Sequence, residues 1–191
     1  TVTPLVLMAY LNPIESMGYT DFIAGAHAAG VDGVLTVDLP PEEAAELIEP
    51  LQAVDIAPIF LLAPTSSPAR IRRTARMAHG YLYYVSLKGV TGSAALNPAE
   101  VAEKLAEIRS YTDLPLGVGF GIKDPATAAA IAQVADAVVV GSALVSKMDA
   151  LAQDPERMYR EVAALLAAMR QAMDQGPSPE PKAGSHSPTT P

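Results

Sequence analysis

The sequence contains no cysteine among its 191 residues. This absence excludes a disulfide framework and a zinc site built from thiolates. The net charge of −8 comes without a basic run, which argues against a nucleic-acid-binding surface. No apolar run reaches the ~18 residues that a membrane-spanning helix needs. No signal peptide is recognisable at the start of the sequence, so we expect a cytoplasmic protein.

Half of the residues are hydrophobic, which is enough for one sizeable core, although the chain is shorter than a typical (β/α)₈ barrel of about 250 residues. Short apolar runs without alternation are typical of strands buried on both faces of a parallel sheet. Such runs occur at 3–10, 33–37, 58–62, 81–86, 116–119 and 137–140. Helix patterns follow most of them, at 19–29, 42–51, 68–79, 98–110, 126–134 and 156–174.

Four of the predicted helices share a start signal, a capping residue followed by proline. The pairs are Ser67-Pro68, Asn97-Pro98, Asp124-Pro125 and Asp154-Pro155. The repeated use of one device supports the helix assignments.

About six strand-then-helix units predict a parallel sheet covered by helices. This pattern fits an open doubly wound sheet or most of a barrel. No glycine-rich dinucleotide fingerprint follows the first strand. Glycines instead end the last two strands, where barrels place phosphate, so we favour the barrel. We predict a partial barrel domain over residues 1–175 and a disordered, proline- and serine-rich tail over 176–191.

The segments 114–122 (LPLGVGFGI) and 137–144 (AVVVGSAL) are the most informative part of the chain. Each is an apolar run that reaches glycine, and glycine lets a ligand approach the backbone closely because it has no Cβ. We predict that Gly119, Gly121, Gly141 and Ser142 bind a phosphate group. The alternative is that these glycines only form tight turns.

Several motifs, taken together and in order, resemble the alpha subunit of tryptophan synthase. They are YLNPI at 10–14, VDLPPEE at 37–43, YYVS at 83–86, GVTG at 89–92, GFGI at 119–122 and GSA at 141–143. The resemblance implies a (β/α)₈ TIM barrel, of which this chain would hold strands 3–8 of the family.

The resemblance also implies a function, the retro-aldol cleavage of indole-3-glycerol phosphate to indole and glyceraldehyde 3-phosphate in tryptophan biosynthesis. The alpha subunit of this family uses no cofactor and no metal. Its partner is the beta subunit, which carries pyridoxal phosphate, and the two are expected to form an α₂β₂ heterotetramer.

Site residues follow from the resemblance position by position. Those similar to the family's phosphate-binding set, or directly beside it, are Gly92, Gly119, Phe120, Gly121, Gly141 and Ser142. Tyr83 resembles the tyrosine of the indole pocket, and Thr91 resembles the threonine of a mobile loop that closes over the site. Tyr10 and Asp38 resemble strand-end positions near the substrate pocket and the subunit interface. The alternatives are that Tyr83 is only a core residue and that Asp38 is only a turn acid.

The two catalytic carboxylates of the family, a glutamate and an aspartate, lie in a part that no segment of this chain matches. We therefore expect an N-terminally truncated alpha subunit that is inactive alone, because the reaction needs both proton transfers. The first and last strands would then be open edges of the sheet. Two alternatives stay open: another phosphate-binding barrel, such as a thiamine phosphate or phosphoribosyl anthranilate enzyme, and a non-catalytic partner of the beta subunit.

Overall fold

The computed structural model describes residues 3–86 and 97–176. Within these ranges the strands are β1 (Val6–Ala9), β2 (Gly33–Thr36), β3 (Ala57–Leu62), β4 (Leu82–Val85), β5 (Leu116–Gly119) and β6 (Ala137–Val139). The helices are α1 (Leu11–Met17), α2 (Tyr19–Ala28), α3 (Ala45–Ala53), α4 (Pro68–Met77), α5 (Pro98–Arg109), α6 (Pro125–Ala132), α7 (Ser142–Ala150) and α8 (Pro155–Asp174). The predicted disordered tail beyond residue 176 lies outside the described residues.

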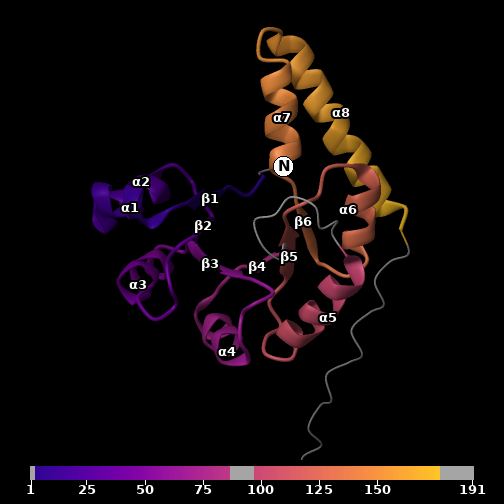
Figure 1. The fold of residues 1–191 in the computed structure, drawn as a ribbon. Helices are drawn as coiled ribbons and strands as arrows, with labels where there is room; N and C mark the ends of the chain where they lie inside the picture. The colour runs from indigo at the N-terminus through magenta and orange to yellow at the C-terminus, as the bar shows by residue number, and fades with distance from the viewer. Residues whose placement is uncertain (1–2, 87–96, 177–191) are drawn as a thin grey trace, which may run out of the picture.

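The described strands form one parallel sheet in chain order, from β1 to β6. The sheet curves, and helices α1 to α6 cover its outer side (Figure 1). The register places Tyr83 beside Gly117 and Val85 beside Gly119. This arrangement is part of a (β/α)₈ barrel and confirms the predicted fold class.

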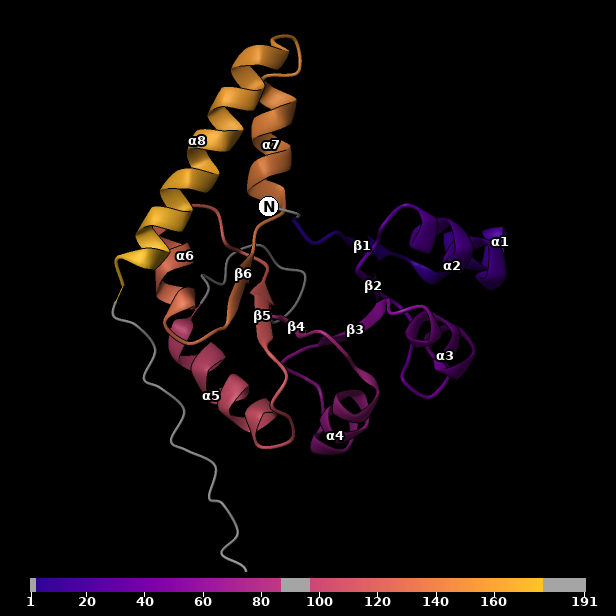
Figure 2. The same ribbon diagram turned by 180° about the vertical axis from the view of Figure 1, so that it is seen from behind.

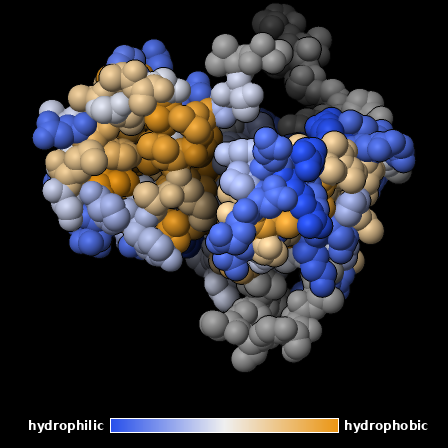
Figure 3. Space-filling view, turned by 90° about the horizontal axis from the view of Figure 1, so that it is seen from above, coloured by the Kyte–Doolittle hydropathy of each residue, from blue (hydrophilic) through white to orange (hydrophobic). Residues whose placement is uncertain are grey.

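β1 and β6 lie at the two ends of the sheet, and among the described residues each pairs with one neighbour only. The predicted open edges are therefore present in this part of the chain. Large apolar side chains are exposed near β1, among them those of Leu5, Met8, Tyr10 and Met17. The view from above shows apolar surface gathered over these N-terminal elements (Figure 3).

The core has two layers because successive side chains of a strand point to opposite faces of the sheet. The outer layer, between sheet and helices, contains fully buried residues such as Leu62, Ile71, Leu105 and Leu116. The inner layer is a smaller cluster formed by Leu35, Ile59 and Tyr83 from three successive strands. Tyr83 therefore faces the inside of the curved sheet.

We expect the substitution Leu105→Ala to lower the free energy of unfolding by about 2–5 kcal/mol, the usual cost of a cavity at a fully buried leucine. Leu105 has no exposed surface in α5. Leu166→Ala in α8 is the matched control, since that side chain is 44% exposed. Its expected cost is below about 1 kcal/mol. Urea-induced unfolding measures both, and equal costs would contradict the assignment of Leu105 to the core.

The four predicted capping residues all cap their helices. The side chains of Ser67, Asn97, Asp124 and Asp154 each accept a hydrogen bond from a backbone N–H in the first turn of α4, α5, α6 and α8, with proline beside each cap. Such caps satisfy backbone donors that have no partner inside the helix. The predicted bounds of these four helices agree with the structure to within a few residues.

Three local details differ from the sequence-based expectations. α1 was not predicted, and its first turn includes Pro13, which is tolerated there because its missing N–H would have no helical partner. The helix predicted at 42–51 begins only at Ala45, since a turn closed by Glu43 N–H to Pro40 O precedes it. α7 was not predicted, and none of its residues is buried.

α7 and α8 lie side by side and extend beyond the sheet as a pair, which is clear from both sides (Figures 1 and 2). α8 also packs along α6, where Met169 is buried. None of the helices in the described ranges combines the length and the apolar character that crossing a membrane requires.

Candidate functional site

The site lies where β4, β5 and β6 end, because the carboxyl ends of parallel strands share one edge of the sheet. β5 ends at Gly119 and continues into Phe120 and Gly121, and β6 leads through Gly141 into α7, which begins at Ser142. β5 and β6 are neighbours. The structure thus brings two glycine-bearing strand ends, which lie apart in the sequence, to adjacent places.

Phe120, Gly121, Gly141 and Ser142 are all exposed. Gly141 is the N-cap of α7, and the N–H groups of the first helical turn have no partner inside the helix. Backbone N–H groups at such a position suit an anion. The arrangement therefore offers donors from two neighbouring segments to a ligand at this edge.

The backbone turns sharply after β5. Phe120 has φ of 86° and Gly121 has φ of 77°, both in the left-handed region. Apart from Asp55, Phe120 is the only residue other than glycine within 3–86 and 97–176 that has such a conformation. A positive φ is unfavourable for a bulky residue and is frequent at ligand-binding sites.

Ser86, the residue after β4, contacts this turn. Its hydroxyl donates to the carbonyl oxygens of Gly119 and Phe120, at 2.9 and 3.1 Å, and its N–H donates to Gly119 O at 3.1 Å. Ser86 ends the YYVS motif at 83–86 and is the polar residue directly after a buried strand, a pattern typical of the ligand face of a parallel sheet.

Tyr83 lies under the same turn. A Cβ added to Gly119 would stand 1.9 Å from the Tyr83 hydroxyl oxygen, so the ring fills the space that a side chain at position 119 would need. Tyr83 is 6% exposed. Burial, and to a smaller degree Tyr81, raises the pKa of the Tyr83 hydroxyl above its ordinary value. The hydroxyl is therefore protonated at neutral pH and able to donate.

Tyr10 and Asp38 lie at the same edge of the sheet but at its β1–β2 end. Tyr10 is 63% exposed and precedes α1. The Asp38 carboxylate accepts a hydrogen bond from Leu11 N–H at 2.7 Å, which joins the segment after β2 to the start of α1. Asp38 thus lies both in a turn and at a strand end, so its position fits either of the two interpretations of this residue.

Two predicted residues, Thr91 and Gly92, lie outside the described residues. Within 3–86 and 97–176, no group of three or more histidine or acidic side chains is placed to hold a metal ion.

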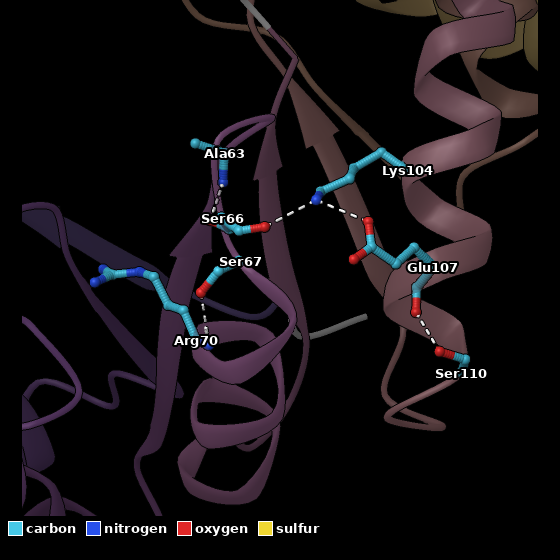
Figure 4. A network of polar contacts seen from close by, with 7 residues as sticks. All are labelled: Ala63, Ser66, Ser67, Arg70, Lys104, Glu107 and Ser110. Carbon is cyan, nitrogen blue, oxygen red and sulfur yellow. Dashed lines mark hydrogen bonds and ion pairs between the residues drawn. The ribbon is translucent and has the colours of Figure 1, made fainter.

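A polar network fixes the neighbouring turn after β3 (Figure 4). The ammonium group of Lys104 in α5 donates to Ser66 O at 2.9 Å and to Glu107 at 2.8 Å. The Ser66 hydroxyl in turn accepts from Ala63 N–H, and the Ser67 hydroxyl caps α4. These bonds tie α4 and α5 to the strand end and give the ligand-facing edge a rigid support.

The arginine-rich face of α4 has local partners. Arg73 pairs with Glu42, and Arg72 lies over the ring of Tyr111, 5.5 Å from its centre. Arg72, Arg73 and Arg76 line a hollow of about 300 Å³ that is open to solvent. The positive charges of these arginines are partly compensated by Glu42 and Tyr111, as expected for a helix face exposed to solvent.

Comparison with known proteins agrees with the fold. The family model described as tryptophan synthase alpha chain matches residues 1–174. The alpha chain of Thioalkalivibrio sulfidiphilus is 62% identical over 172 residues, and that of Methylococcus capsulatus is 60% identical over 172 residues. Each alignment covers 90% of this chain. The chain spans 65% and 64% of the length of these two relatives.

Solved structures give the same result. The tryptophan synthase subunit alpha from Legionella pneumophila superposes with a TM-score of 0.80 at 41% identity, over 90% of this chain and 63% of that one. Tryptophan synthase from M. tuberculosis superposes with a TM-score of 0.78 at 32% identity, over 91% and 63% of the two chains. The chain is therefore a member of the tryptophan synthase alpha chain family.

Proposed function

We propose that this chain carries the phosphate- and indole-binding part of a lyase that cleaves indole-3-glycerol phosphate to indole and glyceraldehyde 3-phosphate. The observation that carries the proposal is the meeting of two glycine-bearing strand ends, 119–121 and 141–142, beside the start of α7. Backbone N–H groups at such a place hold the phosphate of the substrate.

In the proposed complex, the indole ring lies on the inner side of the curved sheet near Tyr83. Tyr83 belongs there to an apolar cluster with Leu35 and Ile59, which suits an aromatic ring. Its protonated hydroxyl supplies one polar contact.

The cleavage is a retro-aldol reaction. The indole C3 gains a proton, the glycerol hydroxyl next to the broken C–C bond loses one, and the indole N–H must be stabilised. Positioned acids and bases perform these transfers. Among the described acids at the carboxyl edge, Asp38 is engaged with Leu11 N–H. We propose that the two catalytic carboxylates are supplied from outside this chain, and that the complete subunit pairs with a tryptophan synthase beta subunit.

The chain contains no tryptophan, so the emission of an indole ligand can be followed without interference from protein indole. We expect the fluorescence anisotropy of indole-3-glycerol phosphate to rise on binding. Tyr83→Leu should weaken binding by about tenfold or more, the equivalent of about 1.4 kcal/mol of lost aromatic contact. Tyr159→Leu in α8 is the control, since Tyr159 is 69% exposed and distant in the fold.

Two results would contradict the proposal. One is an anisotropy that does not change at any protein concentration. The other is tighter binding of thiamine phosphate, measured by competition, which would favour another phosphate-binding barrel. Binding that is insensitive to Tyr83→Leu would place the indole ring elsewhere and leave Tyr83 as a core residue.

A further inference from the structure

We propose that Ser86 is the positioning residue of the phosphate site. Its hydroxyl fixes the two peptides that follow Gly119, so that the N–H groups of Phe120 and Gly121 face the anion. This inference rests on the proposed function, and it adds the residue that follows a third strand, β4, to a site otherwise formed after β5 and β6.

The first support is the geometry of the hydroxyl. Ser86 Oγ lies 2.9 Å from Gly119 O and 3.1 Å from Phe120 O, so a single hydroxyl contacts two successive carbonyl groups. Ser86 N–H donates to Gly119 O as well, at 3.1 Å. The serine is itself anchored, because the residue before it, Val85, pairs with Gly119 in the sheet.

The second support is the planarity of the peptide bond. In a trans peptide the C=O and N–H groups point in opposite directions. The described part of the chain contains no cis peptide. With the carbonyl groups of Gly119 and Phe120 turned toward Ser86, the N–H groups of Phe120 and Gly121 must point away from it. Within 3–86 and 97–176, the Gly121 N–H has no backbone hydrogen bond, which leaves it available to a ligand.

The third support is the strained conformation of Phe120. A residue with a side chain keeps a φ of 86° only where its surroundings impose it. Packing of the Phe120 ring does not impose it, since the side chain is 56% exposed. Tyr83 blocks the inner side of Gly119, and the Ser86 hydroxyl holds the carbonyl groups. The hydrogen bonds of Ser86 are thus contacts that stabilise the turn.

The test uses inorganic phosphate as the probe and amide ¹⁵N–¹H NMR spectra of the full chain. We expect phosphate to shift the Phe120 and Gly121 amide signals. Ser86→Ala should raise the dissociation constant of phosphate by about tenfold, as expected for the loss of the one or two hydrogen bonds that orient the donors. Ser86→Thr keeps a hydroxyl and should restore binding to near that of the unchanged chain.

Ser110→Ala is the matched control. The Ser110 hydroxyl also donates to a backbone carbonyl, that of Glu107 at 2.6 Å, but it lies at the C-terminal end of α5 (Figure 4). A merely structural loss would affect both alanine variants alike, whereas the proposal predicts a loss of phosphate binding in Ser86→Ala alone.

Three results overturn the proposal, and they are distinguishable. If Ser86→Ala binds phosphate as the unchanged chain does, Ser86 is no positioning residue while the phosphate site itself stands. If Ser86→Thr is as weak as Ser86→Ala, the hydroxyl is not the operative group. If phosphate leaves the Phe120 and Gly121 signals of the unchanged chain unmoved, the phosphate site, and with it the proposed function, is wrong.

Discussion

Replacing Ser142 with aspartate is expected to weaken phosphate binding strongly while leaving the stability of the protein unchanged or slightly higher. Ser142 is the first residue of α7 and is exposed, so a larger side chain meets no steric barrier. A carboxylate in the first turn of a helix interacts favourably with the helix dipole. The same carboxylate would repel a bound phosphate, since two unit charges 4 Å apart repel by about 4 kcal/mol at an effective dielectric constant of about 20.

The expected loss of phosphate affinity in Ser142→Asp is about a hundredfold, smaller than the full Coulomb energy because the site is exposed. Ser142→Asn is the matched control, with the same shape and no charge, and should keep most of the affinity. Calorimetric titration with inorganic phosphate measures both, and thermal unfolding confirms that both are folded. Equal affinities of the two variants would show that the anion binds elsewhere.

Gly119→Ala is expected to have the second large effect, on both stability and ligand binding. The new methyl group would stand 1.9 Å from the Tyr83 hydroxyl oxygen and 2.5 Å from the carbon that bears it. Tyr83 is buried and cannot move freely, so overpacking should cost about 1–3 kcal/mol of stability. The displaced turn should also weaken phosphate binding.

Two further variants accompany Gly119→Ala. One is a control glycine-to-alanine change elsewhere in the chain, and the other is a double variant that relieves the clash with Tyr83. Gly25→Ala, in the middle of α2, has nothing within 4 Å of the added Cβ and should stabilise the protein by up to about 1 kcal/mol. In the double variant Gly119→Ala/Tyr83→Leu the clash is relieved. Its cost should therefore fall below the sum of the two single costs, by about 0.5–3 kcal/mol. Additive costs in urea unfolding would mean that the two side chains do not meet.

Much of the fold follows from local sequence signals. The strand runs and the four cap-plus-proline pairs depend on neighbours in the sequence, and the structure confirms them. α1 and α7 lacked such signals. Pro13 lies in the first turn of α1, where proline is tolerated but gives no helix signal, and α7 buries no residue that would impose a helical period on its apolar side chains.

The site was predictable to a lesser degree. Glycine at the ends of two successive strands indicates where a ligand can approach the backbone, and these glycines do lie together. The contacts of Ser86 with Gly119 and Phe120 join residues 33 and 34 positions apart. They depend on the register of β4 against β5, which sequence patterns do not specify. The contact between Tyr83 and Gly119 also depends on this register. From the sequence alone, an aromatic residue in a strand predicts burial but not the residue that it contacts.

We propose that residues 1–191 bind the substrate of the alpha subunit but do not include the groups that transfer protons. The most direct test measures indole release from indole-3-glycerol phosphate by the chain alone, with a tryptophan synthase beta subunit, and with the N-terminal third of a related alpha chain added. The account predicts no indole above background in the first two cases and measurable release in the third. Indole release by the chain alone would contradict it, and would assign the proton transfers to acids of this chain, with Asp38 the first to substitute.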